Sequence, residues 1–217
     1  DTDLVANDKI TNGDNEAALF TPLSATRATV SQSSEQASTG TFSAKATFSG
    51  GSASHYINAT TIPAGEAIYF SYDIYIPASY TGAGIKTIDT SDGSFSTATI
   101  NTRDTWVNVS GSRAAKSTSW PLGIGQNHAE NVDGQSVYID NLTIKTLDQD
   151  RSVSGKGLIV NGTVSRDPVS SGADLVAYSG FSASNYLEQP YNSDLDFGTG
   201  DYCVMGWVKG GLDGQSL

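Results

Sequence analysis

The stretch AIYFSYDIYIP, from Ala67 to Pro77, decides the fold class of this chain. Its side chains alternate between two faces. One face carries Ile68, Phe70, Tyr72, Ile74 and Ile76, and the other carries Tyr69, Ser71, Asp73 and Tyr75. A period of two residues indicates a β-strand with one buried face. Pro77 cannot donate a hydrogen bond to a neighbouring strand, and it is expected to end this one.

The same period recurs through most of the chain before residue 148. It is found in residues 41–49, 54–62, 84–90, 94–100, 105–111, 121–127 and 136–147. Turn pairs such as Asp92-Gly93 and Asp133-Gly134 separate these stretches at short intervals, which is typical of a β-sandwich or jelly roll. No amphipathic helix longer than a turn or two is evident. The sequence therefore predicts an all-β fold that begins with a jelly-roll β-sandwich.

Composition changes after residue 147, where charge and glycine replace the apolar alternation. We expect residues 1–147 to form the first domain, 148–156 a linker and 157–217 the start of a second domain. The last segment has short strands over about sixty residues, whereas a complete sandwich usually takes about a hundred. The second sandwich is therefore predicted to be incomplete and to continue beyond Leu217. The first residues, DTDLVANDK, suggest a trimmed or internal N-terminus.

Charge and cysteine content exclude several classes of function. The chain has 12 Lys and Arg residues against 23 Asp and Glu residues, a formal net charge of −11. Such a surface repels phosphates, so no nucleic-acid partner is expected. No run approaches the roughly 18 apolar residues of a membrane span, so no membrane insertion is expected. Cys203, the only cysteine, is predicted to be a buried thiol in the strand 202–209, without a disulfide or cysteine metal site.

Five sequence segments resemble the family 4 and family 9 type of carbohydrate-binding module, a jelly-roll group attached to many secreted glycosidases. They are NGDNE (12–16), STGTFSAKATF (38–48), PAGEAIYFSYDIYI (63–76), RDTWVNVSG (103–111) and the closing VYIDNLTI (137–144). Their order and spacing carry the resemblance over residues 3–147. Asn15 stands where these modules have an aromatic residue, which predicts looser packing beneath the first strand. The closing strand is expected to pair with the N-terminal segment.

The remainder of the chain resembles the beginning of a concanavalin A-like, laminin-G-like lectin or glucanase domain. The matching segments are GKGLIVNGTV (155–164) and NYLEQPYNSDLDFGTGDYCVMGWVK (185–209). Together with DRSVSGKG (150–157), these segments are very similar in sequence to lectin-like domains in virion and tail-fibre proteins of marine bacteriophages. The resemblance implies an incomplete concanavalin-like β-sandwich after the jelly roll.

The first resemblance also implies a structural calcium ion. In those modules the acidic residues of the early run and the Asp of the closing strand hold a cation, and the matching positions here are Asp14, Glu16 and Asp140. Hard carboxylate oxygens suit Ca²⁺. The alternative is that Asp14 caps a turn and Asp140 accepts backbone hydrogen bonds.

A sugar site needs exposed aromatic rings flanked by amides. We predict Trp120 and Tyr56 as stacking residues, with Gln126 and Asn127 as hydrogen-bond partners. Tyr69 and Tyr75 lie on a strand that could also line the binding face, although aromatic residues are enriched in strands whatever their function. Trp106 occupies a position that is in the core of the resembling modules and is discounted.

Three functions remain open. The leading hypothesis is a non-catalytic virion appendage of a bacteriophage, such as a tail fibre. It would lie on the virion surface, form a homo-oligomer, with a trimer as one option, and contact other virion proteins and cell-surface polysaccharide. The alternatives are the carbohydrate-binding portion of a secreted bacterial glycoside hydrolase and a purely architectural capsid or tail protein. No enzyme is expected, because none of the five glutamates is spaced for glycoside hydrolysis and no other catalytic motif occurs.

Overall fold

The computed structural model describes residues 4–5, 8–20, 24–51, 54–93, 95–126, 131–148, 157–170, 175–189, 198–199 and 203. All regular secondary structure in these residues is β-strand, which confirms the all-β prediction. Within the same ranges no helix has the length and apolarity needed to cross a membrane.

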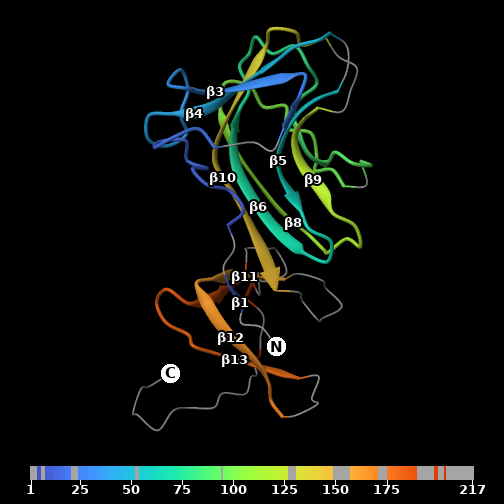
Figure 1. Ribbon diagram of the computed structural model, residues 1–217. Coiled ribbons are helices and arrows are strands. Elements are labelled where there is room, and N and C mark those ends of the chain that lie inside the picture. The colour runs from blue at the N-terminus through green and yellow to red at the C-terminus, as the bar shows by residue number, and fades with distance from the viewer. Residues whose placement is uncertain are drawn as a thin grey trace.

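Two antiparallel sheets face each other as a β-sandwich (Figure 1). The first sheet has the order β3 (Ala28–Ser33), β4 (Ser43–Phe48), β10 (Ser136–Asp148), β6 (Ala67–Tyr75) and β8 (Trp106–Arg113). The second sheet has the order β2 (Ser24–Thr26), β5 (His55–Ile62), β9 (Trp120–Gln126) and β7 (Lys86–Asp89). The strand predicted at Ala67–Pro77 is β6, which lies inside the first sheet between β10 and β8.

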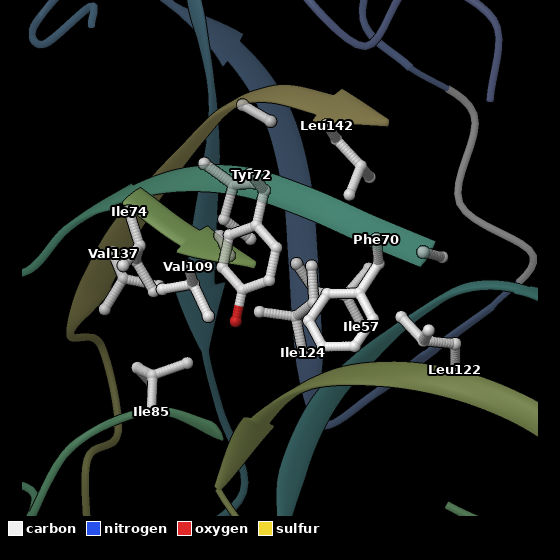
Figure 2. Packing of buried hydrophobic residues seen from close by; sticks show 14 of the residues in the cluster. Ile57, Phe70, Tyr72, Ile74, Ile85, Val109, Leu122, Ile124, Val137 and Leu142 are labelled. Atoms are coloured by element: carbon white, nitrogen blue, oxygen red, sulfur yellow. The ribbon is translucent and has the colours of Figure 1, made fainter. Parts of the chain in front are cut away.

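The core fills the space between the two sheets. Figure 2 shows Phe70, Tyr72 and Ile74 of β6 packed among side chains from the opposite layer, including Ile57, Leu122 and Ile124. Burial of these side chains supplies the main favourable term for folding. The only polar atom that Tyr72 brings into this core, its hydroxyl oxygen, is satisfied by Thr87 Oγ1 at 2.8 Å. The apolar face of Ala67–Pro77 is thus the buried face that its alternation predicts.

Two parts of the strand prediction were wrong. Residues 95–100 form no strand and make only isolated bridges, from Ser96 to Ile88 of β7 and from Ile100 to Ile85 just before it. Conversely, β2 and β3 were not predicted. β3 has the sequence ATVSQS and lies at the edge of its sheet, where a strand buries little of either face and needs few apolar residues.

The N-terminal segment packs along β10, as the resemblance predicted. Lys9 N donates to Ile144 O at 2.8 Å, and Leu142 N donates to Gly13 O at 2.9 Å. A Cβ atom at residue 13 would lie 1.9 Å from Leu142 O, so only glycine allows this approach. The register of β10 against β6 shifts between Asp140 and Thr143, which is where the N-terminal segment meets it.

A smaller group of strands follows the sandwich. It contains β11 (Leu158–Asn161), β12 (Thr163–Pro168), β13 (Val176–Ser179), β14 (Tyr186–Glu188) and β1 (Leu4–Val5). β10 extends out of the sandwich to pair with β11, while β1 pairs with β12 (Figure 1). The N-terminal strand therefore pairs with a strand that follows residue 156, rather than within residues 1–147.

One further prediction in the last segment was wrong. Cys203 is exposed, not buried. The rest of the strand expected at 202–209 lies outside the described residues.

Candidate functional site

Three aromatic rings stand side by side on the outer face of the first sheet. Tyr75 of β6 is paired in register with Trp106 of β8 on one side and with Tyr138 of β10 on the other. The ring centroids of Tyr75 and Trp106 are 5.6 Å apart, and those of Tyr75 and Tyr138 are 6.1 Å apart. These side chains point outward because Ile74, Val107 and Ile139, their chain neighbours, turn towards the core. We call Trp106, Tyr75 and Tyr138 the aromatic row.

The row is closed at one end and open at the other. Lys45 of β4 is paired with Tyr138, and its Nζ lies 5.7 Å from the centre of that ring. Glu35 accepts hydrogen bonds from Lys45 Nζ and from the Tyr138 hydroxyl, and these two bonds, led by that of Lys45, lower the pKa of Glu35. Tyr138 is consequently only 6% exposed, whereas Tyr75 and Trp106 are half-buried and keep part of their rings accessible.

A polar patch adjoins the aromatic row one step along the strands. Asp73 precedes Tyr75 by two residues on β6 and therefore shares its face. Asp73 Oδ1 accepts from Asn108 Nδ2 at 2.9 Å, and its Oδ2 accepts from Ser38 Oγ at 2.8 Å and from Asn141 Nδ2 at 2.9 Å. Burial by itself would raise the pKa of Asp73, but the hydrogen bonds from Asn141, Asn108 and Ser38 lower it. The carboxylate is thus held ionised at neutral pH.

This combination suits a sugar ligand. A pyranose has an apolar C–H face that packs on an aromatic ring and hydroxyl groups that need hydrogen-bond partners when they lose water. The open face of a sheet can offer both along an extended chain. The prediction for Trp106 was wrong in this respect, because Trp106 is half-buried on the outer face and not in the core. Tyr75 was named only as a secondary candidate.

The predicted stacking pair does not share a surface. Trp120 is 1% exposed and packs among core residues such as Phe95 at 6.2 Å between ring centroids, so it offers no face to a sugar. Tyr56 lies on the outer side of the second sheet, where it lines a pocket of about 230 Å³ together with residues 88–93 and Ser54. The two residues face opposite sides of that sheet, and the prediction for Trp120 was wrong.

The predicted amide partner that the structure describes, Gln126, does not lie at the pocket of Tyr56. Gln126 is 1% exposed and points into the core. Its Nε2 lies 3.2 Å from His55 Nδ1, and His55 Nε2 lies 3.1 Å from Ser49 O. Asn127 lies outside the described residues. Of the three described residues among those predicted for sugar binding, only Tyr56 lies at a surface pocket.

The three predicted calcium ligands are not gathered into one site. Glu16 Oε1 accepts from the backbone N–H groups of Thr41 and Phe42 at 2.7 and 2.8 Å. Asp140 Oδ2 accepts from those of Ser38 and Thr39, and Asp14 Oδ1 accepts from that of Glu16. Among the described residues no group of three or more His, Cys, Asp or Glu side chains could hold a metal ion. These contacts fit the turn-capping alternative, and calcium binding stays a prediction.

Comparison with known proteins gives structural likeness only. No protein-family model matches the chain, and no curated protein matches it. The similar solved structures include a family 16 carbohydrate-binding module, 16% identical with a TM-score of 0.40 over 62% of this chain and 97% of that one. The CBM22-1 xylan-binding domain from Paenibacillus barcinonensis Xyn10C is 16% identical, with a TM-score of 0.38. The match covers 57% of this chain and 84% of that one.

A third similar structure is the CBM22-1–CBM22-2 tandem domain from the same Paenibacillus protein. It is 14% identical with a TM-score of 0.44, over 82% of this chain and 61% of that one. At such TM-scores these likenesses carry no argument about a ligand. The function has to follow from the residues of this chain.

Proposed function

We propose that the sandwich of residues 8–148 is a carbohydrate-binding module whose ligand lies across the aromatic row. The observation that carries this proposal is the cross-strand register of Trp106, Tyr75 and Tyr138 on one outer sheet face. The two half-buried rings, Trp106 and Tyr75, offer neighbouring stacking positions to a sugar chain, and the polar patch supplies hydrogen-bonding groups next to them. A shallow, open face favours a polysaccharide over a single sugar, because affinity has to accumulate over several weak contacts.

The module works outside the producing cell, where polysaccharide is found. It serves either as the carbohydrate-binding portion of a secreted bacterial glycoside hydrolase or as part of a bacteriophage virion appendage, with a concanavalin-like sandwich after it. In both settings the module itself performs no catalysis. Its role is to hold a larger assembly against its target surface.

The test is binding to a panel of soluble polysaccharides by affinity electrophoresis and calorimetry. We expect Trp106→Ala and Tyr75→Ala each to weaken binding about fivefold, since one stacked ring contributes on the order of 1 kcal/mol and 1.4 kcal/mol is a factor of ten. Tyr56→Ala, on the other sheet, is the matched control and should bind like the parent. Loss in Tyr56→Ala with full binding in Trp106→Ala would move the site to the pocket beside Tyr56.

A second candidate function is assembly, and a separate observation favours it. The large hydrophobic side chains that stay exposed in the described residues all lie between residues 169 and 186. They are Val169 at 53%, Leu175 at 66%, Phe181 at 57% and Tyr186 at 42% exposed. Exposed hydrophobic side chains of this size favour contact with another protein surface. Sedimentation velocity distinguishes the glycoside hydrolase setting from the virion setting, because an appended binding module should be monomeric and a virion appendage oligomeric.

A further inference from the structure

One amide beside the aromatic row has its orientation fixed by the fold. Asn108 follows Trp106 by two residues on β8, so the two side chains share the outer face at a spacing of about 7 Å. Asn108 is paired in register with Asp73 of β6 and is exposed. Its Nδ2 donates to Asp73 Oδ1 at 2.9 Å and to Ser71 Oγ at 3.3 Å.

The direction of this amide follows from the chemistry of its partner. An ionised carboxylate only accepts hydrogen bonds, so Asn108 must turn its NH₂ group towards Asp73. The hydrogen bonds from Asn141 and Asn108 that lower the pKa of Asp73 keep that carboxylate ionised. Asn108 Oδ1 is then turned away from both partners, and no hydrogen bond to this oxygen occurs among the described residues. A fixed acceptor therefore stands beside the most accessible end of the aromatic row.

We propose that Asn108 Oδ1 accepts a hydrogen bond from a hydroxyl of the bound glycan, and that Asp73 is the positioning residue that keeps the acceptor turned outward. This inference rests on the proposed function and deepens it by naming the ligand class. The patch offers an acceptor backed by a carboxylate, and Asp104 adds another carboxylate where it accepts from the Tyr75 hydroxyl at 3.3 Å. A glycan rich in free hydroxyl donors fits this surface, whereas one that carries carboxylate or sulfate groups is repelled.

The experiment compares two probes with the same polymer backbone, one neutral and one charged. The first is the neutral polysaccharide that the parent binds best in the panel, and the second is the carboxymethylated form of the same polymer. We expect the parent to bind the charged form at least tenfold more weakly. Asn108→Ala should bind the neutral polymer with about tenfold lower affinity than the parent. Asn108→Asp keeps the size of the side chain but adds a charge beside Asp73. Its affinity for the neutral polymer should fall at least as much as that of Asn108→Ala.

Asp73→Asn tests the positioning role through selectivity. With two amides in contact, Asn108 is free to turn and a negative charge is gone. Binding of the neutral polymer should fall severalfold, and the preference for it over the charged form should narrow, which a purely structural role would not produce. If Asp73→Asn proves unstable, the exposed Asn108 variants carry the test alone. The thermal midpoint of Asn108→Ala should match that of the parent, whereas the carboxylate added beside Asp73 in Asn108→Asp should lower it.

The outcomes distinguish the role of Asn108 from the proposed glycan binding at the aromatic row. Full binding by Asn108→Ala, with loss in Trp106→Ala, would overturn the role of the amide and leave the aromatic row as the site. Full binding by Trp106→Ala as well would overturn the proposed function. Equal binding of the neutral and carboxymethylated polymers by the parent would overturn the assignment of ligand class.

Discussion

Asn15 shows how a single residue can replace an aromatic side chain without loosening the core. Its side chain is fully buried, with Nδ2 donating to Gly13 O at 3.2 Å and to Ile139 O at 3.3 Å. Its Oδ1 accepts from Phe20 N at 3.3 Å, and Phe20 is itself 1% exposed. The backbone at Asn15 has a φ of 59°, a region that asparagine tolerates better than most residues. The looser packing expected at this position was therefore wrong.

We predict that Asn15→Gly lowers the free energy of unfolding by about 2 kcal/mol, because buried backbone groups lose their partners while glycine still accepts the positive φ. Asn15→Ala should lose about 1 kcal/mol more, since alanine adds backbone strain. Urea denaturation measures both. Asn101→Ala at an exposed position is the control and should stay within about 0.5 kcal/mol of the parent. A Gly variant as stable as the parent would show that water replaces the amide.

Asp89 is a second residue whose contribution depends on its partners. Its side chain is fully buried at the end of β7, where Oδ2 contacts Arg113 at 2.9 Å and Lys116 at 2.8 Å. Arg113 also lies 4.2 Å above the ring of Trp120, so one ionic cluster joins β8 to the second sheet. Burial alone would raise the pKa of Asp89, but the hydrogen bonds from Lys116, Ser91 and Arg113 hold it far below its usual range.

This lowered pKa has a defined consequence for stability. A carboxyl group whose pKa is lower in the folded state stabilises the fold fully above its unfolded pKa of about 3.9, and the contribution disappears as the pH falls through the folded value. We therefore expect part of the parent's acid destabilisation below about pH 4 to vanish in Asp89→Asn. At neutral pH that variant should be about 3 kcal/mol less stable, because Arg113 and Lys116 each lose their ion pair with this buried carboxylate. Urea titrations from neutral to acidic pH measure both effects, and exposed Asp167→Asn is the control. If the unfolding free energies of the parent and Asp89→Asn ran parallel with pH, Asp89 would not be the source of the acid destabilisation.

At the scale of elements, β8 and β9 assign opposite roles to their tryptophans. Trp106 begins β8 with its ring on the outer face of the first sheet, next to Tyr75. Trp120 begins β9 with its ring in the core. The roles expected from sequence were the reverse of these. Which face a residue occupies is thus set by the pairing of its strand, not by the residue type.

The two tryptophans should consequently respond differently to truncation. We expect Trp120→Ala to lower the free energy of unfolding by about 4 kcal/mol, because it leaves a cavity in the core and removes the ring beneath Arg113. Trp106→Ala should cost about 1 kcal/mol or less, since its ring is only half-buried. Thermal and urea denaturation give the stabilities. A larger loss for Trp106 than for Trp120 would place the core on the other side of the first sheet.

How much of these elements could be predicted depends on where their signal lies. The alternation in β4, β5, β6 and β10 is local and predicted those strands nearly to their ends. In β9, Pro121, Gly123 and Gly125 alternate with Trp120, Leu122 and Ile124, which places Trp120 on the apolar face, and the prediction of Trp120 as a stacking residue overlooked this pattern. The aromatic row carries no such local signal, because Trp106, Tyr75 and Tyr138 meet only through pairings of strands far apart in the sequence. The polar patch of Asp73, Asn108 and Asn141 was missed for the same reason.

At the scale of the whole molecule, apolar surface is divided unevenly. The sandwich buries nearly all of its large hydrophobic side chains between two sheets. The strands after residue 156 have only Ile159, Val160 and Val164 as buried hydrophobic residues in the described ranges. The exposed set at 169–186 belongs to the same strands and the loops that join them. Water contact with these side chains is unfavourable, so a second copy of the chain would stabilise them by covering them.

We therefore predict that the chain self-associates through this surface. Sedimentation velocity at increasing concentration should show an oligomer, and the double variant Leu175→Ser with Phe181→Ser should sediment as a monomer. Ser184→Ala, a change at an exposed polar residue of the same region, is the control and should behave like the parent. The aromatic row lies on the sandwich and not on the strands after residue 156, so the monomeric variant should keep its intrinsic affinity for soluble oligosaccharide. Its retention on an insoluble polysaccharide should fall, because an oligomer engages several sites at once and a monomer only one. A parent that stays monomeric at every concentration would contradict the assembly surface without affecting the glycan site.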